Sequence, residues 1–254
     1  MKVIVNADDY GLNENVNSAI IDAISLGMVT DTSILATVEE GFSLAVTQER
    51  LKILKYSAGV HLTLTVGKPL TEEMRKDPSF CDADGYFLDH LPYKVHLSKT
   101  QRRNIELEFL AQIHKIKDAG LFISHLDSHQ HIHYRPTLYS IIIKCCKAEN
   151  IRFIRRPKTF SSTFKDSVYS FFLCTIYGFN GLRFTDYFID YRWIPSLPKD
   201  NNKTVEVMCH PVYNSKLLIV DKIKKNTIDE CELLENHIIR ANELWNMCNY
   251  SDLV

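Results

Sequence analysis

Residues 3–11 read Val-Ile-Val-Asn-Ala-Asp-Asp-Tyr-Gly, and this segment carries the main signal for both the fold and the site. The apolar run 3–5 predicts a buried strand, and Gly11 permits a sharp turn before an amphipathic stretch that starts near Asn13. Asp8 and Asp9 then stand at the end of a buried strand, where two carboxylates are costly unless they bind or use something. Because neighbouring strand side chains point to different faces, one acid could hold a metal while the other handles a proton. The alternative is a turn whose acids cap the next helix.

Working outward, short β-rich runs alternate with helical patterns along the chain. We expect strands at 3–7, 29–36, 56–64, 121–126, 151–155 and 204–209. Helices are expected at 14–26, 42–51, 99–119, 136–149, 164–177 and 227–248, the last opened by a capping-box pattern at Thr227. This alternation predicts an α/β fold with a parallel sheet, which is compatible with both an open sheet and a barrel. Polar residues at the C-terminal ends of several strands favour a barrel-like arrangement.

The chain of 254 residues shows no composition break, so we expect a single domain over 1–254, with insertions near 67–98 and 186–203. The net charge of −1 gives no reason to expect a nucleic-acid partner. Seven cysteines without framework spacing indicate reduced thiols in a cytoplasmic protein. Met1 and Lys2 lead directly into the first strand, and no apolar run reaches spanning length, so neither a signal peptide nor membrane insertion is expected.

Four polar groups follow or end the expected strands. They are the Asp8-Asp9 pair, His61 in Gly-Val-His-Leu-Thr-Leu (59–64), the run Ser-His-Leu-Asp-Ser-His-Gln-His-Ile-His (124–133), and His210 in Cys-His-Pro (209–211). A lone histidine in a strand is more often a hydrogen-bonded core residue than a ligand. Four histidines and one aspartate within nine positions, however, are hard to explain by packing alone.

A divalent metal site matches this set of side chains. Imidazole and carboxylate ligands suit zinc and related ions, and a catalytic site needs about three protein ligands plus an open position. A carboxylate can then take a proton and a histidine can supply one. The Asp8-Asp9 pair, His61, His125 and His210 supply each of these roles once. If the segment stays extended, His129, His131 and His133 share one face, and we expect them to support the site or contact the substrate rather than bind the metal.

These motifs resemble the YdjC-like carbohydrate deacetylases, which include chito-oligosaccharide deacetylases. The matching pieces are Asn-Ala-Asp-Asp-Tyr-Gly (6–11), residues 59–64 with Gly-Lys-Pro-Leu (67–70), residues 124–133 with Pro136, and Cys-His-Pro (209–211). They cover nearly the whole chain in the same order. Tyr10 stands where that family often has Phe, and residues 153–192 align with nothing that we recognise.

The resemblance implies a distorted (β/α) TIM-like barrel, one divalent metal ion (Mg²⁺ or Zn²⁺), and removal of an N-acetyl group from an amino sugar. Carried over by motif, it implies Asp9, His61 and His125 as ligands. It further implies Asp8 as general base and His210 as general acid. We expect substrate-binding or supporting roles for four more residues, namely Asp127, His129, His131 and Arg155; for Arg155 a helix-capping or ion-pair role carries equal weight.

The implied substrate is a short N-acetylglucosamine oligosaccharide such as diacetylchitobiose, and relatives suggest a homodimer. Two other functions remain open at this point. One is a metal-dependent phosphoesterase or amidohydrolase on a barrel, although such enzymes commonly carry a His-x-His pair where this chain has Asp8-Asp9. The other is a non-catalytic sugar-binding relative, against which the retained acids and histidines argue.

Overall fold

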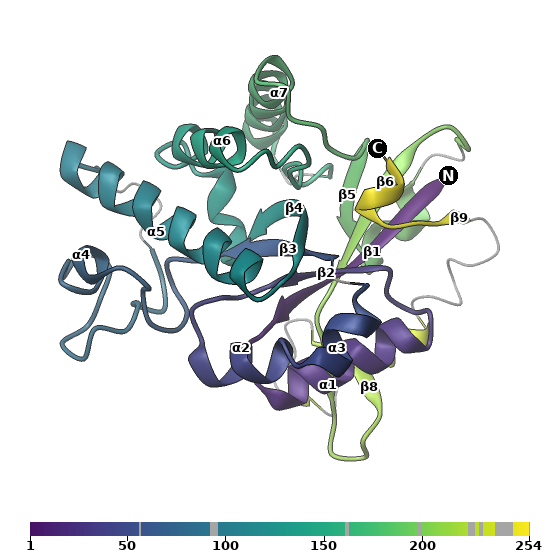
Figure 1. Cartoon of the computed structure of the whole chain (residues 1–254). Coiled ribbons are helices and arrows are strands. Elements are labelled where there is room, and N and C mark those ends of the chain that lie inside the picture. Colours follow the sequence, from purple (N-terminus) through teal and green to yellow (C-terminus); the bar gives the residue numbers. More distant parts are fainter. Residues whose placement is uncertain are drawn as a thin grey trace.

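The computed structural model describes residues 1–55, 57–91, 96–160, 163–197, 200–222, 227–228, 231–236 and 246–253. A parallel sheet forms its centre (Figure 1). Its strands stand in the order β4-β3-β2-β1-β6-β5, and β9 pairs with the start of β1. Their bounds are β1 Lys2–Tyr10, β2 Asp31–Ile34, β3 Ser57–Leu62, β4 Phe122–Ser128, β5 Tyr187–Asp190, β6 Thr204–Cys209 and β9 Asn246–Met247. The predicted α/β fold with a parallel sheet is confirmed.

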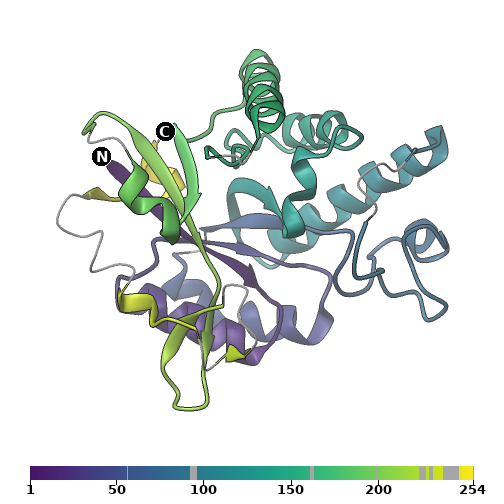
Figure 2. The same cartoon turned by 180° about the vertical axis from the view of Figure 1, so that it is seen from behind.

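Helices connect the strands and cover the sheet. In Figures 1 and 2 helices α1 to α3 lie together on one side, whereas α6 and α7 lie on the other. Their bounds are α1 Glu14–Ser25, α2 Glu39–Ala45, α3 Gln48–Ile53, α4 Glu72–Arg75, α5 Lys99–Asp118, α6 Tyr139–Ala148 and α7 Phe164–Phe179. Local sequence sets three of the starts: Asn13 accepts a hydrogen bond from the backbone of Val16, Ser98 forms a capping box with Gln101, and Thr163 accepts one from the backbone of Asp166.

Two of the elements expected before residue 200 differ in the structure. The predicted helix 42–51 is two short helices, α2 and α3, separated at Val46 and Thr47. The predicted strand 151–155 is not a continuous strand, because only single bridges form there, from Leu126 to Ile154 and from Phe153 to Arg183. The strand next to β6 is instead β5, which lies at the start of the segment 186–203 that the sequence marked as an insertion.

The edges of the continuous sheet are β4 and β5. Among the described residues, the two single bridges and a backbone hydrogen bond from Thr159 to Phe188 connect the segments between these edges. The chain is therefore one α/β domain with a mostly parallel sheet and flanking helices. Closure into a barrel stays a prediction.

The C-terminal region departs from the expected helix 227–248. Leu233 forms a bridge with Val220, residues 234–236 are helical, and 246–247 belong to β9. Residues 237–245 of the expected helix lie outside the described part of the chain. The antiparallel pair β7 (Pro211–Tyr213) and β8 (Ile219–Asp221) precedes this region, and the 3-10 helix η4 (Tyr250–Leu253) follows it.

The strand register brings the polar strand ends together. Ala7 pairs with Cys209, so Asp8 and His210 follow two neighbouring strands at the same edge. His61 pairs with Asp127 across β3 and β4. Both pairs lie at the C-terminal edge of the sheet. None of the described helices has the length and hydropathy needed to cross a bilayer.

Candidate metal centre

A β-bulge at the end of β1 places the two adjacent acids. Three steps along β1, from Ala7 to Tyr10, match only two steps along β2, and Asp9 has a left-handed backbone with φ +68°. Bulges redirect side chains, and a left-handed non-glycine residue is strained by about 1–3 kcal/mol. As a result both carboxylates reach His61: each of the two acids lies within 4.8 Å of a nitrogen of that ring.

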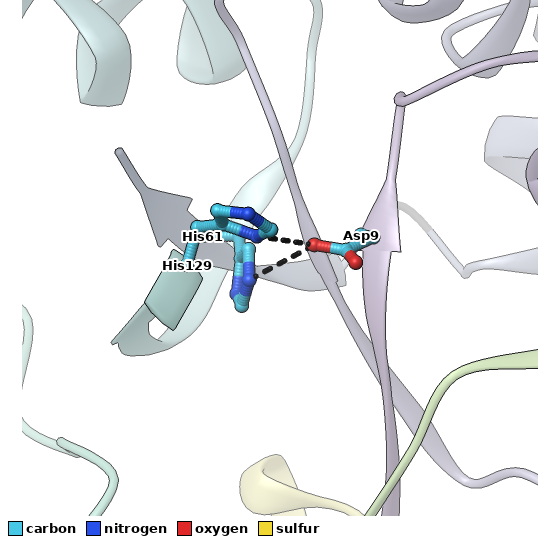
Figure 3. Close-up of side chains that lie close together, drawn as sticks. All are labelled: Asp9, His61 and His129. Atoms are coloured by element: carbon cyan, nitrogen blue, oxygen red, sulfur yellow. Dashed lines mark hydrogen bonds and ion pairs between the residues drawn. The ribbon is translucent and has the colours of Figure 1, made fainter. Parts of the chain in front are cut away.

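Asp9, His61 and His129 converge at one point (Figure 3). The Asp9 Oδ1 atom lies 3.2 Å from His61 Nε2 and 2.9 Å from His129 Nδ1. His61 is buried, whereas the side chains of Asp9 and His129 are 16% and 21% exposed. Two imidazoles and one carboxylate, open on one side, are the donor set of a catalytic zinc-type site.

Contacts behind His61 orient its ring. His61 Nδ1 lies 2.7 Å from Asp127 Oδ1 and 3.0 Å from the Ser33 hydroxyl, which leaves Nε2 to face Asp9. A carboxylate on the far nitrogen of a ligand histidine is the usual support in metal sites. Burial acts to lower the pKa of His61, but Asp127 and Asp9 outweigh it and raise the pKa to about 10. The His61 ring is therefore protonated, and its positive charge balances Asp127 and Asp9. A bound cation would take over this role and displace the proton from the ring.

Arg155 is a fully buried hub beneath the site. Its guanidinium makes a bidentate contact with Asp8 (2.7 and 2.7 Å), and it also contacts Asp127 at 2.7 Å and Glu206 at 2.6 Å. The ring of Phe188 lies against it at 4.8 Å. Burial acts to raise the pKa of Asp8, but the charge of Arg155 lowers it below its usual value. One guanidinium thus faces three carboxyl groups, and the ion-pair role left open by the sequence is the one the structure shows.

The balance of charge favours a cation. Asp9 adds a fourth carboxyl group, and its pKa is held well below the usual value because His129 and His61 outweigh the effect of burial. Against these acids stand Arg155 and the protonated His61. Burial raises the pKa of Glu206 to about 7, whereas the pKa values of Asp8, Asp9 and Asp127 are lowered, so three ionised acids face two positive charges. A buried cluster with an excess of negative charge is costly unless a cation compensates it. The described residues therefore fit a divalent metal ion at the Asp9–His61–His129 point.

His125 does not lie with these three residues, and we correct its assignment as a ligand. Among the described residues it belongs to neither group of potential ligands. Its ring is buried, stacks on Tyr250 at 4.0 Å and fills the space beside Gly59. Burial lowers the pKa of His125 to about 3, so the ring is neutral. It lies two residues before Asp127 on β4, or roughly 6–7 Å farther from the edge that carries the site.

The segment after β4 is not extended. The prediction that His129, His131 and His133 share one face depended on an extended backbone, so it does not hold. The segment is the 3-10 helix η1 (His129–Tyr134), interrupted by left-handed backbone at Gln130 and His131. His133 turns into the core and bonds the Ser128 hydroxyl. His131 is half-buried and stacks on Tyr134 at 5.3 Å, and burial lowers its pKa to about 3. Only His129 reaches the acids.

His210 lies at the same edge but makes no described contact with the three converging residues. Its backbone N–H donates to Asp221 at 2.8 Å, and its Nδ1 atom is buried without a hydrogen-bond partner among the described residues. Strand pairing sets it beside Asp8.

Sequence reasoning missed two supporting residues. Glu206 binds Arg155, and it accepts a 2.5 Å hydrogen bond from the hydroxyl of Tyr250. The sequence could have indicated a role for Glu206, since it is a single acid inside the otherwise apolar strand 205–208. No sequence pattern indicates a role for Tyr250, because only the fold brings the C-terminal residues under the site.

The fold and the site together define a class: α/β proteins with a candidate cation centre at the C-terminal edge of a parallel sheet. The profile of the family described as "YdjC-like protein" matches residues 2–249, and the chain belongs to that family. A relative from Halalkalibacterium halodurans is 34% identical over 86% of this chain and 88% of its own length. One from Clostridium beijerinckii is 28% identical over 93% and 92% of the two chains. Both are named carbohydrate deacetylase.

A solved structure has the same fold. It is described as a putative cellobiose-phosphate cleavage protein from Enterococcus faecalis, with a TM-score of 0.72 and 24% identity over 100% of this chain and 98% of that one. At this identity the similarity shows the fold alone.

Proposed function

We propose that this protein is a metal-dependent carbohydrate deacetylase that hydrolyses the N-acetyl amide bond of an amino sugar. The observation that carries the proposal is the convergence of Asp9, His61 and His129 beside a second acid, Asp8, that Arg155 holds in place. The names of the relatives support the same reaction.

In this proposal Asp9, His61 and His129 hold one divalent cation. Once bound there, such an ion would polarise the acetamide carbonyl and lower the pKa of water toward neutrality. The paired imidazoles favour Zn²⁺ or a similar ion, and Mg²⁺ is the alternative that the family resemblance allows. Asp127 acts through His61, since it fixes the ring that the ion would meet.

Asp8 is the proposed general base. Arg155 occupies both of its oxygens and Asn6 donates to Oδ1 at 2.8 Å, so one of about four acceptor positions stays available for the proton of an attacking water. The same contacts fix the direction in which that position points. His210 is the proposed general acid, which protonates the departing amine from the neighbouring strand end.

The substrate that we propose is a short N-acetylglucosamine oligosaccharide, such as diacetylchitobiose. His131 next to the ligand segment is the proposed substrate contact. A distorted barrel is the proposed architecture, supported by the single bridges that lie between β4 and β5.

Acetate release from diacetylchitobiose tests the proposal. The chelated protein should be inactive, and addition of Zn²⁺ or Mg²⁺ should restore release. A parallel panel of phosphate esters covers the phosphoesterase alternative, and a binding measurement with the same sugar covers the non-catalytic one. Release from no N-acetylated saccharide with any divalent metal would reject the deacetylase assignment.

A further inference from the structure

Helix α7 carries an apolar stripe on its outer face. Phe164, Phe171 and Phe179 are 84%, 75% and 89% exposed, while Val168 and Phe172 are about half exposed at 51% and 48%. With the exposed Thr175 they form what we call the outer stripe: Phe164, Val168, Phe171, Phe172, Thr175 and Phe179. Spacings of three and four residues place these side chains on one side of the helix.

The polar groups along this face do not require water. The Thr175 hydroxyl donates to the backbone carbonyl of Phe171 at 2.9 Å, and the Ser167 hydroxyl donates to that of Thr163 at 3.3 Å. No charged residue occurs between Ser167 and Phe179. An apolar partner could therefore cover the outer stripe without leaving buried hydrogen-bonding groups unsatisfied.

The opposite face of α7 already packs on its own chain. Tyr177 is buried and donates to the carbonyl of His133 at 3.0 Å, and Tyr169 donates to that of Tyr134 at 2.5 Å. The inner face thus holds η1, the segment that begins with His129. Figures 1 and 2 show α7 at the periphery of the molecule, beside α6. The hydrogen bonds from α7 to η1 come from Tyr169 and Tyr177, and the outer stripe touches this face through Phe172, which stacks on Tyr169 with ring centres 6.3 Å apart.

The residue types of the outer stripe are arranged symmetrically about its midpoint. About the midpoint between Phe171 and Phe172, phenylalanines stand opposite each other at 164 and 179, and two β-branched residues of similar size do so at 168 and 175. A two-fold axis through that midpoint and perpendicular to the helix would superimpose the stripe on itself. An isologous interface between identical chains has this symmetry, because each residue must face its symmetry-related counterpart.

The exposed area is large enough to matter. A phenylalanine side chain offers about 150–250 Å², so the four rings at their exposed fractions contribute on the order of 600 Å² per chain. A standard interface takes roughly 800 Å² from each partner.

Other partners fit the outer stripe less well. A membrane-surface helix would need lysines and arginines on its flanks, yet α7 has one lysine, Lys165, next to Asp166. A saccharide would find no free hydrogen-bond donor along the stripe.

The family resemblance already implies a homodimer. Beyond that, we propose that the interface between the two copies is α7, with the helices antiparallel and the two-fold axis between Phe171 and Phe172. This proposal is independent of the reaction. It also gives α7 support on both faces: the partner helix outside, and η1 with its metal-ligand segment inside.

Light scattering across about 1–100 μM protein tests the association, with the wild type expected as a dimer. F171E sets a carboxylate beside the axis in an apolar contact and should raise the dimer dissociation constant at least ~100-fold. F122E is the matched control, since Phe122 is 68% exposed at the start of β4, and it should leave the dimer unchanged. Circular dichroism melting checks that both variants fold. A monomeric wild type would overturn the proposal, and this includes a monomer that binds phosphatidylglycerol vesicles or insoluble chitin. An F171E variant that dimerises with wild-type affinity would also overturn it.

A charge-pair experiment tests the antiparallel direction. Position 164 of one copy should face position 179 of the other, so F164K alone and F179E alone should each weaken the dimer. The double variant F164K/F179E sets opposite charges against each other twice and should recover at least ~10-fold of the lost affinity. Parallel helices would set like charges together, and the double variant would then be the weakest of the three.

Discussion

At the residue scale, the site depends on how two adjacent aspartates separate their tasks. Asp8 turns to Arg155, whereas Asp9 turns to His61 and His129. An ordinary strand would send them to opposite faces. The bulge and the left-handed Asp9 instead keep both near His61, at the cost of local backbone strain.

His129→Ala and His125→Ala form a matched pair of substitutions with opposite expected effects. The first removes a proposed ligand from a partly open position and should lower metal affinity more than ~100-fold, with little change in the melting temperature of the chelated, metal-free protein. The second leaves a hole beside Gly59 and Tyr250 and should destabilise the fold by about 2–4 kcal/mol while metal still binds. Metal occupancy after dialysis and thermal melting measure the two effects. Loss of metal from the His125 variant alone would reverse our assignment.

At the scale of elements, strand ends and short helices build the site together. β1 supplies the acids, β3 supplies His61, and η1 supplies His129. The C-terminal η4 supports them from below, since Tyr250 bonds Glu206 by its hydroxyl and the Asp31 carboxylate of β2 by its backbone N–H at 3.0 Å. These contacts predict that loss of η4 weakens the sheet centre.

The docking of η4 on β2 should depend on pH through Asp31. Burial raises the pKa of Asp31 to about 7, outweighing the hydrogen bonds from Tyr250 and Thr32. Between the unfolded pKa and this value the folded state keeps a proton that the unfolded state has lost, so the contribution of Asp31 to stability falls as pH rises.

Asp31→Asn removes this titration. The free energy of unfolding of the wild type minus that of the variant should therefore fall by about 2–3 kcal/mol between pH 5 and pH 8. Urea unfolding across that range measures the difference. A difference that stays constant would show that Asp31 ionises in the folded state at its ordinary pKa, and a rising difference would likewise contradict a raised pKa.

At the scale of the whole molecule, a bound cation should stabilise the native chain, because the three ligands come from distant parts of the sequence. Binding only to the folded state adds about 2.7 kcal/mol at a metal concentration of a hundred times the dissociation constant. We expect Zn²⁺ to raise the melting temperature of the chelated wild type and to leave the His129→Ala variant unchanged. An equal rise in both proteins would indicate a different binding site.

The sequence predicted the sheet class and most of the site because strong local signals carried both. The apolar runs before Asp8 and His61 gave β1 and β3. The four-residue strand β5 was missed because the bulky aromatic sequence around it has no clear period.

His125 was chosen over His129 because sequence spacing does not reveal depth along a strand. Both histidines flank Asp127 at two residues' distance, and only the end of β4 decides which one reaches the open edge. Likewise, the partners of Arg155 come from β1, β4 and β6, and no local sequence pattern predicts that they meet.

Anomalous diffraction from Zn²⁺-soaked crystals tests the central claim most directly. Our account predicts one strong peak at the edge of the sheet, about 2.0–2.2 Å from Asp9 Oδ1, His61 Nε2 and a ring nitrogen of His129. A peak on His125, or full soaking with no peak among these three side chains, would contradict it.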